Sequence, residues 1–216
     1  MTSPLSVIAL GFLLGLQHAT DADHIAAVTT SVSQERTVRR AARLGALWGV
    51  GHSLTILLVG GAIIAFRLVV PPRVGLGLEF GVALMLIGLG FANLRPRGAD
   101  PAAPAPTSTR RPIVIGIVHG LAGSAAVAIL ALSAIRETWQ AVAYLAVFGL
   151  GTIAGMMLVT ALIAAPALFA APAVRRAQGG IRLAAGALSI VVGVLLAREL
   201  IVDGGLFAAV PTWDPH

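Results

Sequence analysis

The stretch "GLQHATDADHIAAV", residues 15–28, places two histidines and two aspartates within an apolar run that covers residues 5 to 30. That run is longer than the roughly 20 residues that a helix needs to cross a bilayer. The whole chain is similarly apolar, because 57% of its 216 residues are hydrophobic, 11% are charged and the mean hydropathy is +0.93. A soluble domain of this size does not need such a composition. The stretch therefore predicts an integral membrane protein with polar groups in its interior.

Further apolar runs of similar length follow the first one. They are much longer than the roughly 9 to 11 residues of a membrane barrel strand, and they do not alternate polar with apolar residues. We therefore expect an all-α membrane protein with six transmembrane helices, at residues 5 to 30, 44 to 66, 74 to 94, 113 to 135, 139 to 165 and 181 to 202.

The arginines predict how these helices are oriented. Eleven of the fifteen lie in or beside the first, third and fifth connections, and Arg67, Arg73, Arg136 and Arg198 remain for the other side. The positive-inside rule then places those three connections in the cytoplasm and both termini outside the cell (inner) membrane. The arginines form no continuous basic face, so nucleic acid is not an expected partner. The absence of cysteine excludes disulfides and thiolate metal sites.

The chain divides into two similar halves. Residues 1–94 form the first three-helix unit, residues 95–112 ("RPRGADPAAPAPTSTRRP") a cytoplasmic linker, and residues 113–216 the second unit. "GLQHATDADHIAAV" aligns with "GIVHGLAGSAAVAI", which pairs His18 with His119, and "LWGVGHSLTILLV" aligns with "VFGLGTIAGMMLV". An odd number of helices per unit inverts the second unit in the membrane, so we expect two inverted repeats with a site at their interface.

Small residues spaced four apart recur along these runs, as in Gly11/Gly15, Gly45/Gly49 and Gly77/Gly81. Such pairs let membrane helices approach closely, so they predict helix packing and no direct role in binding.

The polar cluster of the first run has the chemistry of a cation site. Each Asp near the centre of a membrane helix costs about 2.5 to 3.5 kcal/mol, so Asp21 and Asp23 need compensation. The sequence contains no lysine, and a cation that enters and leaves is the natural compensation. Imidazole nitrogens from His18 and His24 together with carboxylate oxygens suit divalent transition metals such as Ni, Co, Zn or Cu, and not Mg or Ca.

Helical geometry leaves two alternatives for this cluster. At 100° per residue, His18, Asp21 and His24 share an arc of about 120°, while Asp23 lies almost opposite His18. Either Asp23 supports the site from a distance, or the helix opens near residues 19–22, as discontinuous helices do at transport sites.

A second helix brings further ligands to the same depth. Counted from the cytoplasmic ends at about 1.5 Å per residue, His24, His52 and His119 all lie roughly 9 to 12 Å into the membrane. The expected metal ligands are thus His18, Asp21, Asp23, His24 and His52, and the secondary candidates are His119, Glu79 and Ser53.

The pattern "H-x-x-x-x-D-H" over His18 to His24, followed by "GHS" with His52, resembles the signature of the nickel/cobalt permease family, NiCoT. The chain is most similar to the shorter six-helix, urease-accessory-type nickel permeases. The resemblance implies transport of Ni²⁺ or Co²⁺ as substrate, with no prosthetic group, and with His18, Asp23, His24 and His52 as functional positions. Full-length relatives carry acidic motifs in later helices, whereas "FGLGTIAGMMLVTAL" contains no carboxylate.

The expected function is therefore a permease for a divalent transition metal, and not an enzyme. Two alternatives use the same histidines, namely an exporter and a membrane-embedded metalloenzyme. The latter needs an acid or base beside an open coordination position, and no "HExxH" motif occurs. No Walker A loop occurs either, so ATP is not the direct driver unless a partner subunit supplies it. The sequence leaves open the choice of metal, the direction of transport, the energy coupling and the presence of a homo-oligomer.

Overall fold

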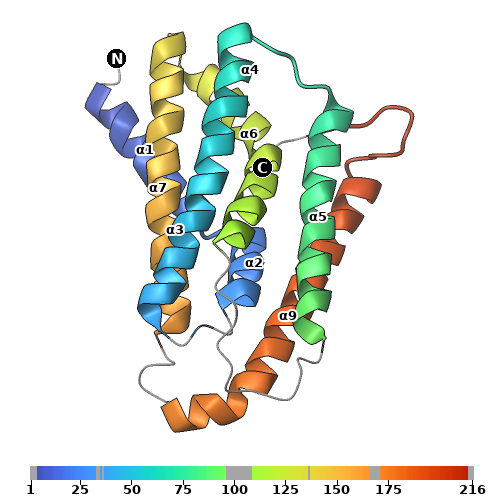
Figure 1. The fold of residues 1–216 in the computed structure, drawn as a ribbon. Coiled ribbons are helices and arrows are strands. Elements are labelled where there is room, and N and C mark those ends of the chain that lie inside the picture. The colour runs from blue at the N-terminus through green and yellow to red at the C-terminus, as the bar shows by residue number, and fades with distance from the viewer. Residues whose placement is uncertain are drawn as a thin grey trace.

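The structure is a computed structural model that describes residues 4–32, 35, 37–95, 109–135, 137–165 and 171–213. Over these ranges the ordered elements are all helical and no strand is present (Figure 1). They are α1 (Pro4–His18), α2 (Ala22–Val32), α3 (Val38–Thr55), the π-helical turn η1 (Ile56–Gly60), α4 (Gly61–Phe66), α5 (Pro72–Leu94), α6 (Arg110–Ala134), α7 (Thr138–Ala164) and α9 (Ala171–Val202).

Four helical segments of the described chain are long and apolar enough to cross a bilayer: Val38–Phe66, Pro72–Leu94, Thr138–Ala164 and Gly179–Val202. A shorter apolar helix covers Ala9–His18. Four of the six predicted spans coincide with these segments, and the predicted runs at 5 to 30 and 113 to 135 are mainly helical too, as expected for an all-α protein.

The helices extend further into the polar segments than hydropathy predicts. The helix expected to start at residue 44 begins at Val38, because the Thr37 hydroxyl accepts the Arg40 backbone N–H at 3.3 Å and so caps it. Similarly, α6 starts at Arg110, inside the expected linker. Most of that linker, residues 96–108, lies outside the described residues.

The first apolar run is not one helix, and the structure has the opened-helix alternative. Helix α1 ends at His18, and the N–H groups of Thr20 and Asp21 bond the carbonyls three residues before them, at 2.8 and 3.1 Å. The Thr20 hydroxyl also bonds the Gln17 carbonyl at 2.6 Å. Side chains of this kind compete for backbone groups and favour helix ends. The chain then restarts as α2, in whose first turn the Asp21 carbonyl accepts the Ile25 N–H at 2.9 Å.

Glycines allow the helices to pack at backbone contact. A Cβ at Gly15 on α1 would collide with the Phe148 carbonyl of α7, and one at Gly116 on α6 would collide with the Trp48 carbonyl of α3. The same kind of contact places α5 against α9, where Gly90 meets Gly186. Close packing is therefore confirmed for Gly11/Gly15 and Gly45/Gly49. The prediction of close packing is wrong for Gly77 and Gly81, because nothing described lies within 4 Å of a Cβ at either position.

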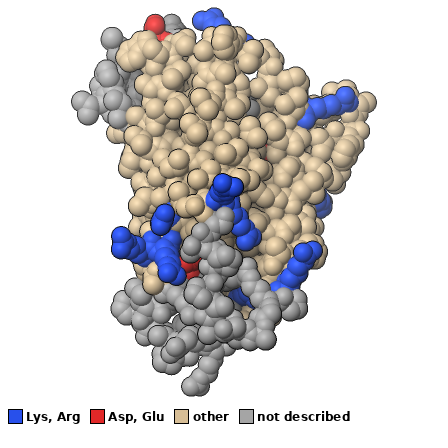
Figure 2. Space-filling model, viewed as in Figure 1, with Lys and Arg blue, Asp and Glu red and all other residues tan. Residues whose placement is uncertain are grey.

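The helices run up and down along one common direction. In the view of Figure 1, α1 begins near the upper end and α3 begins at the lower end, while α6 rises from about mid-height and α9 rises from the lower end into the upper half. On the face seen in Figure 2, most basic side chains gather toward that lower end. In this view the start of α1 and the end of α9 lie toward the same end of the bundle, and the side of the membrane that they face stays a prediction.

Candidate metal centre

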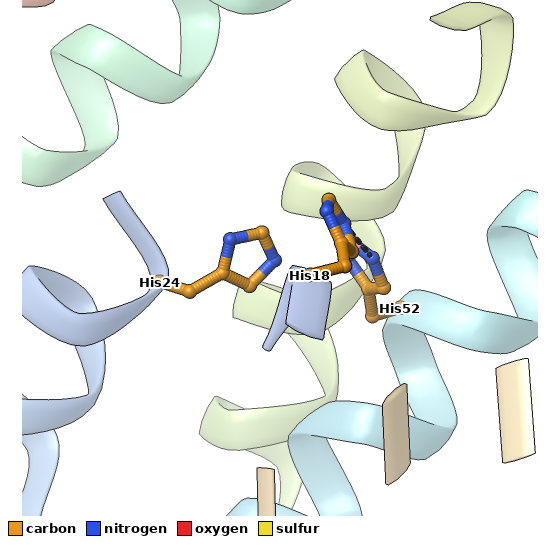
Figure 3. Close-up of side chains that lie close together, drawn as sticks. All are labelled: His18, His24 and His52. Carbon is orange, nitrogen blue, oxygen red and sulfur yellow. Dashed lines mark hydrogen bonds between the residues drawn. The ribbon is translucent and has the colours of Figure 1, made fainter. Parts of the chain in front are cut away.

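Three histidines from separate helices meet where the first helix is broken. His18 ends α1, His24 lies in the first turn of α2 and His52 lies on α3. The Nε2 atoms of His18 and His52 are 3.2 Å apart, and the His24 ring centroid lies 4.5 Å from that of His18 and 5.1 Å from that of His52 (Figure 3). One ligand nitrogen from each of the three lies within 4.8 Å of the others.

This spacing suits a shared metal ion. Two nitrogens that bind one ion at about 2.0 to 2.1 Å, with an angle of about 90 to 110° between them, lie about 2.8 to 3.4 Å apart. The separation of 3.2 Å between His18 and His52 falls in that interval. The Nε2 atom of His24 is buried and has no hydrogen-bond partner, so its lone pair is available to an ion. The three rings can therefore supply three of the ligands of one divalent ion.

The two aspartates bond the Nδ1 atoms of His18 and His24. Asp21 Oδ2 bonds His18 Nδ1 at 2.8 Å, which leaves His18 Nε2 toward His52. Asp23 Oδ1 accepts both the backbone N–H of His24 and its Nδ1, at 2.8 and 2.9 Å. Carboxylates that bond the outer ring nitrogen fix the tautomer of a metal-binding histidine and strengthen its basicity. Each aspartate thus directs an Nε2 atom to the centre.

A fourth histidine completes the cluster. His119 of α6 bonds Asp23 Oδ2 through Nε2 at 2.8 Å, and its ring centroid lies 4.3 Å from that of His24. Asp23, His24 and His119 form a second group whose ligand atoms lie within 4.8 Å of one another. Asp23 therefore links the broken first helix to the second half of the chain.

Burial differs across the cluster. His24, His52 and His119 are 1%, 0% and 2% exposed. The side chains of His18, Asp23 and Asp21 are 18%, 29% and 49% exposed. The aspartates and His18 thus form the more exposed part of the cluster, and the other three rings form its buried part. The carbonyl end of α1, which carries the partial negative charge of its dipole, lies at the same place and favours a cation.

Aromatic side chains that sequence reasoning missed pack against the histidines. The Trp48 ring is stacked on His24 with centroids 6.1 Å apart, and Phe148 lies 5.3 Å from His18. Trp48 lies one helical turn before His52 and therefore on the same face of α3. This spacing is the signal from which sequence reasoning could have placed Trp48 beside the histidines. These rings limit the orientations open to the imidazoles.

The centre lines a cavity of about 490 Å³ between α6 and the pair α5 and α9. Two further carboxylates line it, Glu79 of α5, which the sequence analysis considered, and Glu199 of α9, which it missed. Ser53 takes no part, because its hydroxyl donates to the Gly149 carbonyl at 2.9 Å and so joins α3 to α7.

Comparison with known proteins identifies relatives of this chain. Residues 4–93, which carry His18, His24 and His52, match the model of the NicO family, described as "High-affinity nickel-transport protein". The chain is 34% identical over 218 residues to "Urease accessory protein UreH" from Bacillus sp. (strain TB-90), across 94% of this chain and 95% of that protein. No solved structure matches. These relatives point to transport and not to catalysis, and the chain belongs to the nickel/cobalt permease family.

Proposed function

We propose that this protein is a permease that carries Ni²⁺, with Co²⁺ as the alternative substrate, across the cell membrane through His18, His24 and His52. The observation that carries the proposal is the convergence of these three ring nitrogens at the break in the first membrane helix. Asp21 and Asp23 orient the rings, so they act as positioning residues in this arrangement.

The donor set favours a transition metal over the abundant cellular cations. Imidazole nitrogen is a ligand for Ni, Cu, Zn and Fe, whereas Mg²⁺ and Ca²⁺ prefer oxygen alone. An ion held by several neutral rings within a membrane also keeps its full charge, which the nearby carboxylates offset. The cluster thus combines selectivity with a compensation for the buried charge of the ion.

The packing of the helices supports six spans in two inverted repeats. The sequence alignment pairs α1 with α6 and α3 with α7, and α1 packs on α7 just as α6 packs on α3. Contacts agree residue by residue, since Gly51 meets the Ile113 carbonyl while its counterpart Gly151 meets the Phe12 carbonyl. The repeats share an architecture but not a donor set, because the counterpart of His52 is Thr152.

The orientation that we propose places the start of α1 and the end of α9 outside the cell. Whatever the orientation of the protein, an inside-negative membrane potential favours entry of a cation by about 2.3 kcal/mol per charge per 100 mV. For a divalent ion this is about 4.6 kcal/mol per 100 mV, which is enough to drive uptake without ATP.

Flux through the purified protein tests the proposal. The protein is reconstituted in liposomes, and Ni²⁺ and Co²⁺ entry is measured in parallel with Zn²⁺, Mg²⁺ and Ca²⁺ under an imposed potential. We expect saturable Ni²⁺ or Co²⁺ flux in the wild type. His18→Ala, His24→Ala and His52→Ala should each abolish it while the protein stays folded.

The control is His216→Ala, which removes the one histidine of the sequence that lies outside the four discussed above. It should retain full flux. Net flux against the imposed potential would favour the exporter, and consumption of a substrate without ion flux would favour the metalloenzyme. Undiminished Ni²⁺ flux in all three histidine variants would overturn the proposal.

A further inference from the structure

The cavity that contains the metal centre has a definite direction. Its lining runs from His119 to Ala126 along α6 and from Val192 to Glu199 along α9, which is about 10 Å on each helix. Both helices rise toward the end of the bundle where α9 ends (Figure 1). On α5, which descends, the lining extends back to Glu79. The cavity therefore leads from the histidines to the side on which α9 ends.

Acidic side chains line this cavity. Among its described lining residues, the acidic side chains are Asp21, Asp23, Glu79 and Glu199, and no arginine is present. His52 and His119 line the same cavity, and each has a buried ring nitrogen without a hydrogen-bond partner. A cleft of one charge sign with low-dielectric walls concentrates ions of the opposite sign. The cavity thus has Glu79 and Glu199 on the side on which α9 ends, and two buried ring nitrogens without a hydrogen-bond partner at the metal centre.

The segment after α9 positions one of these carboxylates. Trp213 donates its indole N–H to Glu79 Oε1 at 2.9 Å, and its ring lies directly against Gly75, one turn earlier on α5. The segment is held by Arg73, which donates to the carbonyls of Ala208 and Ala209 at 2.9 and 3.2 Å. Because Gly75 has no side chain, the indole can reach Glu79 along the surface of α5.

We propose that Glu79 and Glu199 form an outer station that captures the hydrated divalent cation before it reaches the histidines, and that Trp213 positions Glu79 for this task. The inference rests on the proposed function and adds a second, weaker binding step to it. The station determines how efficiently the permease collects scarce metal. The histidines determine whether an ion passes at all.

The test measures initial Ni²⁺ uptake against external Ni²⁺ concentration in intact cells, where all molecules have one orientation. The double variant Glu79→Gln/Glu199→Gln should raise the apparent KM by about tenfold at low ionic strength, the lower end of the range for electrostatic focusing. Its maximal rate should remain close to that of the wild type. The difference should shrink in physiological salt, because the Debye length falls from about 30 Å at 0.01 M to about 8 Å at 0.15 M.

Matched variants separate charge from structure. Asp203→Asn removes an exposed carboxylate at the same end of α9 that does not line the cavity, and it should leave KM unchanged. Glu79→Asp retains the charge and should restore most of the loss. Trp213→Phe keeps a ring against Gly75 but removes the N–H donor, and it should produce part of the KM increase.

The outcomes distinguish the two proposals. If His52→Ala abolishes uptake but the double glutamine variant has the KM and salt dependence of the wild type, the outer station does not exist and the permease proposal stands. If the double variant loses maximal rate with KM unchanged, the carboxylates support the fold and the inference is also overturned. If His52→Ala takes up Ni²⁺ normally, the failure lies in the proposed function itself.

Discussion

Asp23→Asn is the substitution that most sharply tests how the metal centre is built. The wild-type carboxylate bonds two histidines at once, His24 through Oδ1 at 2.9 Å and His119 through Oδ2 at 2.8 Å. An Asn side chain has one oxygen and one NH₂ group, so it can accept from only one of the two rings and presents a donor to the other. One ring then loses its orientation, while the side-chain volume is almost unchanged.

The expected loss is that of a supporting residue and not of a ligand. Removal of a partner behind a metal-binding histidine typically weakens metal affinity by about 10- to 100-fold, or about 1.4 to 2.7 kcal/mol. We expect the loss of metal affinity in Asp23→Asn to lie toward the upper end of this range, because the substitution disturbs two histidine rings. Asp21→Asn should lie toward the lower end, because Asp21 contacts His18 alone and its side chain is 49% exposed.

Isothermal titration of Ni²⁺ and Co²⁺ into the purified variants measures both affinities, and thermal unfolding of the metal-free proteins serves as the control for folding. A greater loss in Asp21→Asn than in Asp23→Asn would refute the reasoning, because that order belongs to a regular, unbroken helix. An unchanged affinity in Asp23→Asn would refute it too.

Three further predictions follow from other parts of the structure. His119→Ala should reduce Ni²⁺ flux without abolishing it, since this ring reaches the centre through Asp23, and a complete loss in the liposome assay would make it a ligand. Gly15→Ala should destabilise the protein by about 1 to 3 kcal/mol, because its Cβ would meet the backbone of α7. Gly81→Ala should leave the stability unchanged, because nothing described lies within 4 Å of that position. Equal unfolding temperatures of the two variants would contradict the close packing of α1 on α7. A reporter that is active only outside the cell should be active when fused after His216 and silent when inserted near Ala103, and the reverse result would invert the proposed orientation.

The elements that sequence predicts well are those determined by local chemistry. Apolar runs mark the helices because backbone groups in lipid must bond within the helix. Two histidines and two aspartates in such a run predict a metal site because isolated charges there are costly. The structure brings the four side chains into one cluster, and the binding of a metal ion by them stays a prediction. The same reasoning offered both a regular and an opened first helix. The structure has the opened helix, in which the N–H groups of Thr20 and Asp21 bond carbonyls three residues back, and helical periodicity alone does not choose between the two.

The features that sequence reasoning missed depend on contacts between distant segments. Glu199 follows Arg198 near the end of an apolar run and resembles an ordinary interfacial carboxylate until α5 and α9 place it beside the cavity. The bond from Trp213 to Glu79 joins residues 134 positions apart, and no periodicity signals it. Likewise, the role of His119 becomes visible only when α6 brings it to Asp23.

We propose that imidazole nitrogens of His18, His24 and His52 bind the transported ion, and X-ray absorption of the Ni²⁺-loaded protein tests this binding directly. We expect a nitrogen-rich shell around the ion with the multiple-scattering signature of about three imidazoles, at metal to nitrogen distances of about 2.0 to 2.1 Å. In His52→Ala that signature should fall by one ring. A shell of oxygen ligands alone, or a spectrum that His52→Ala leaves unchanged, would contradict binding of the ion by these histidines.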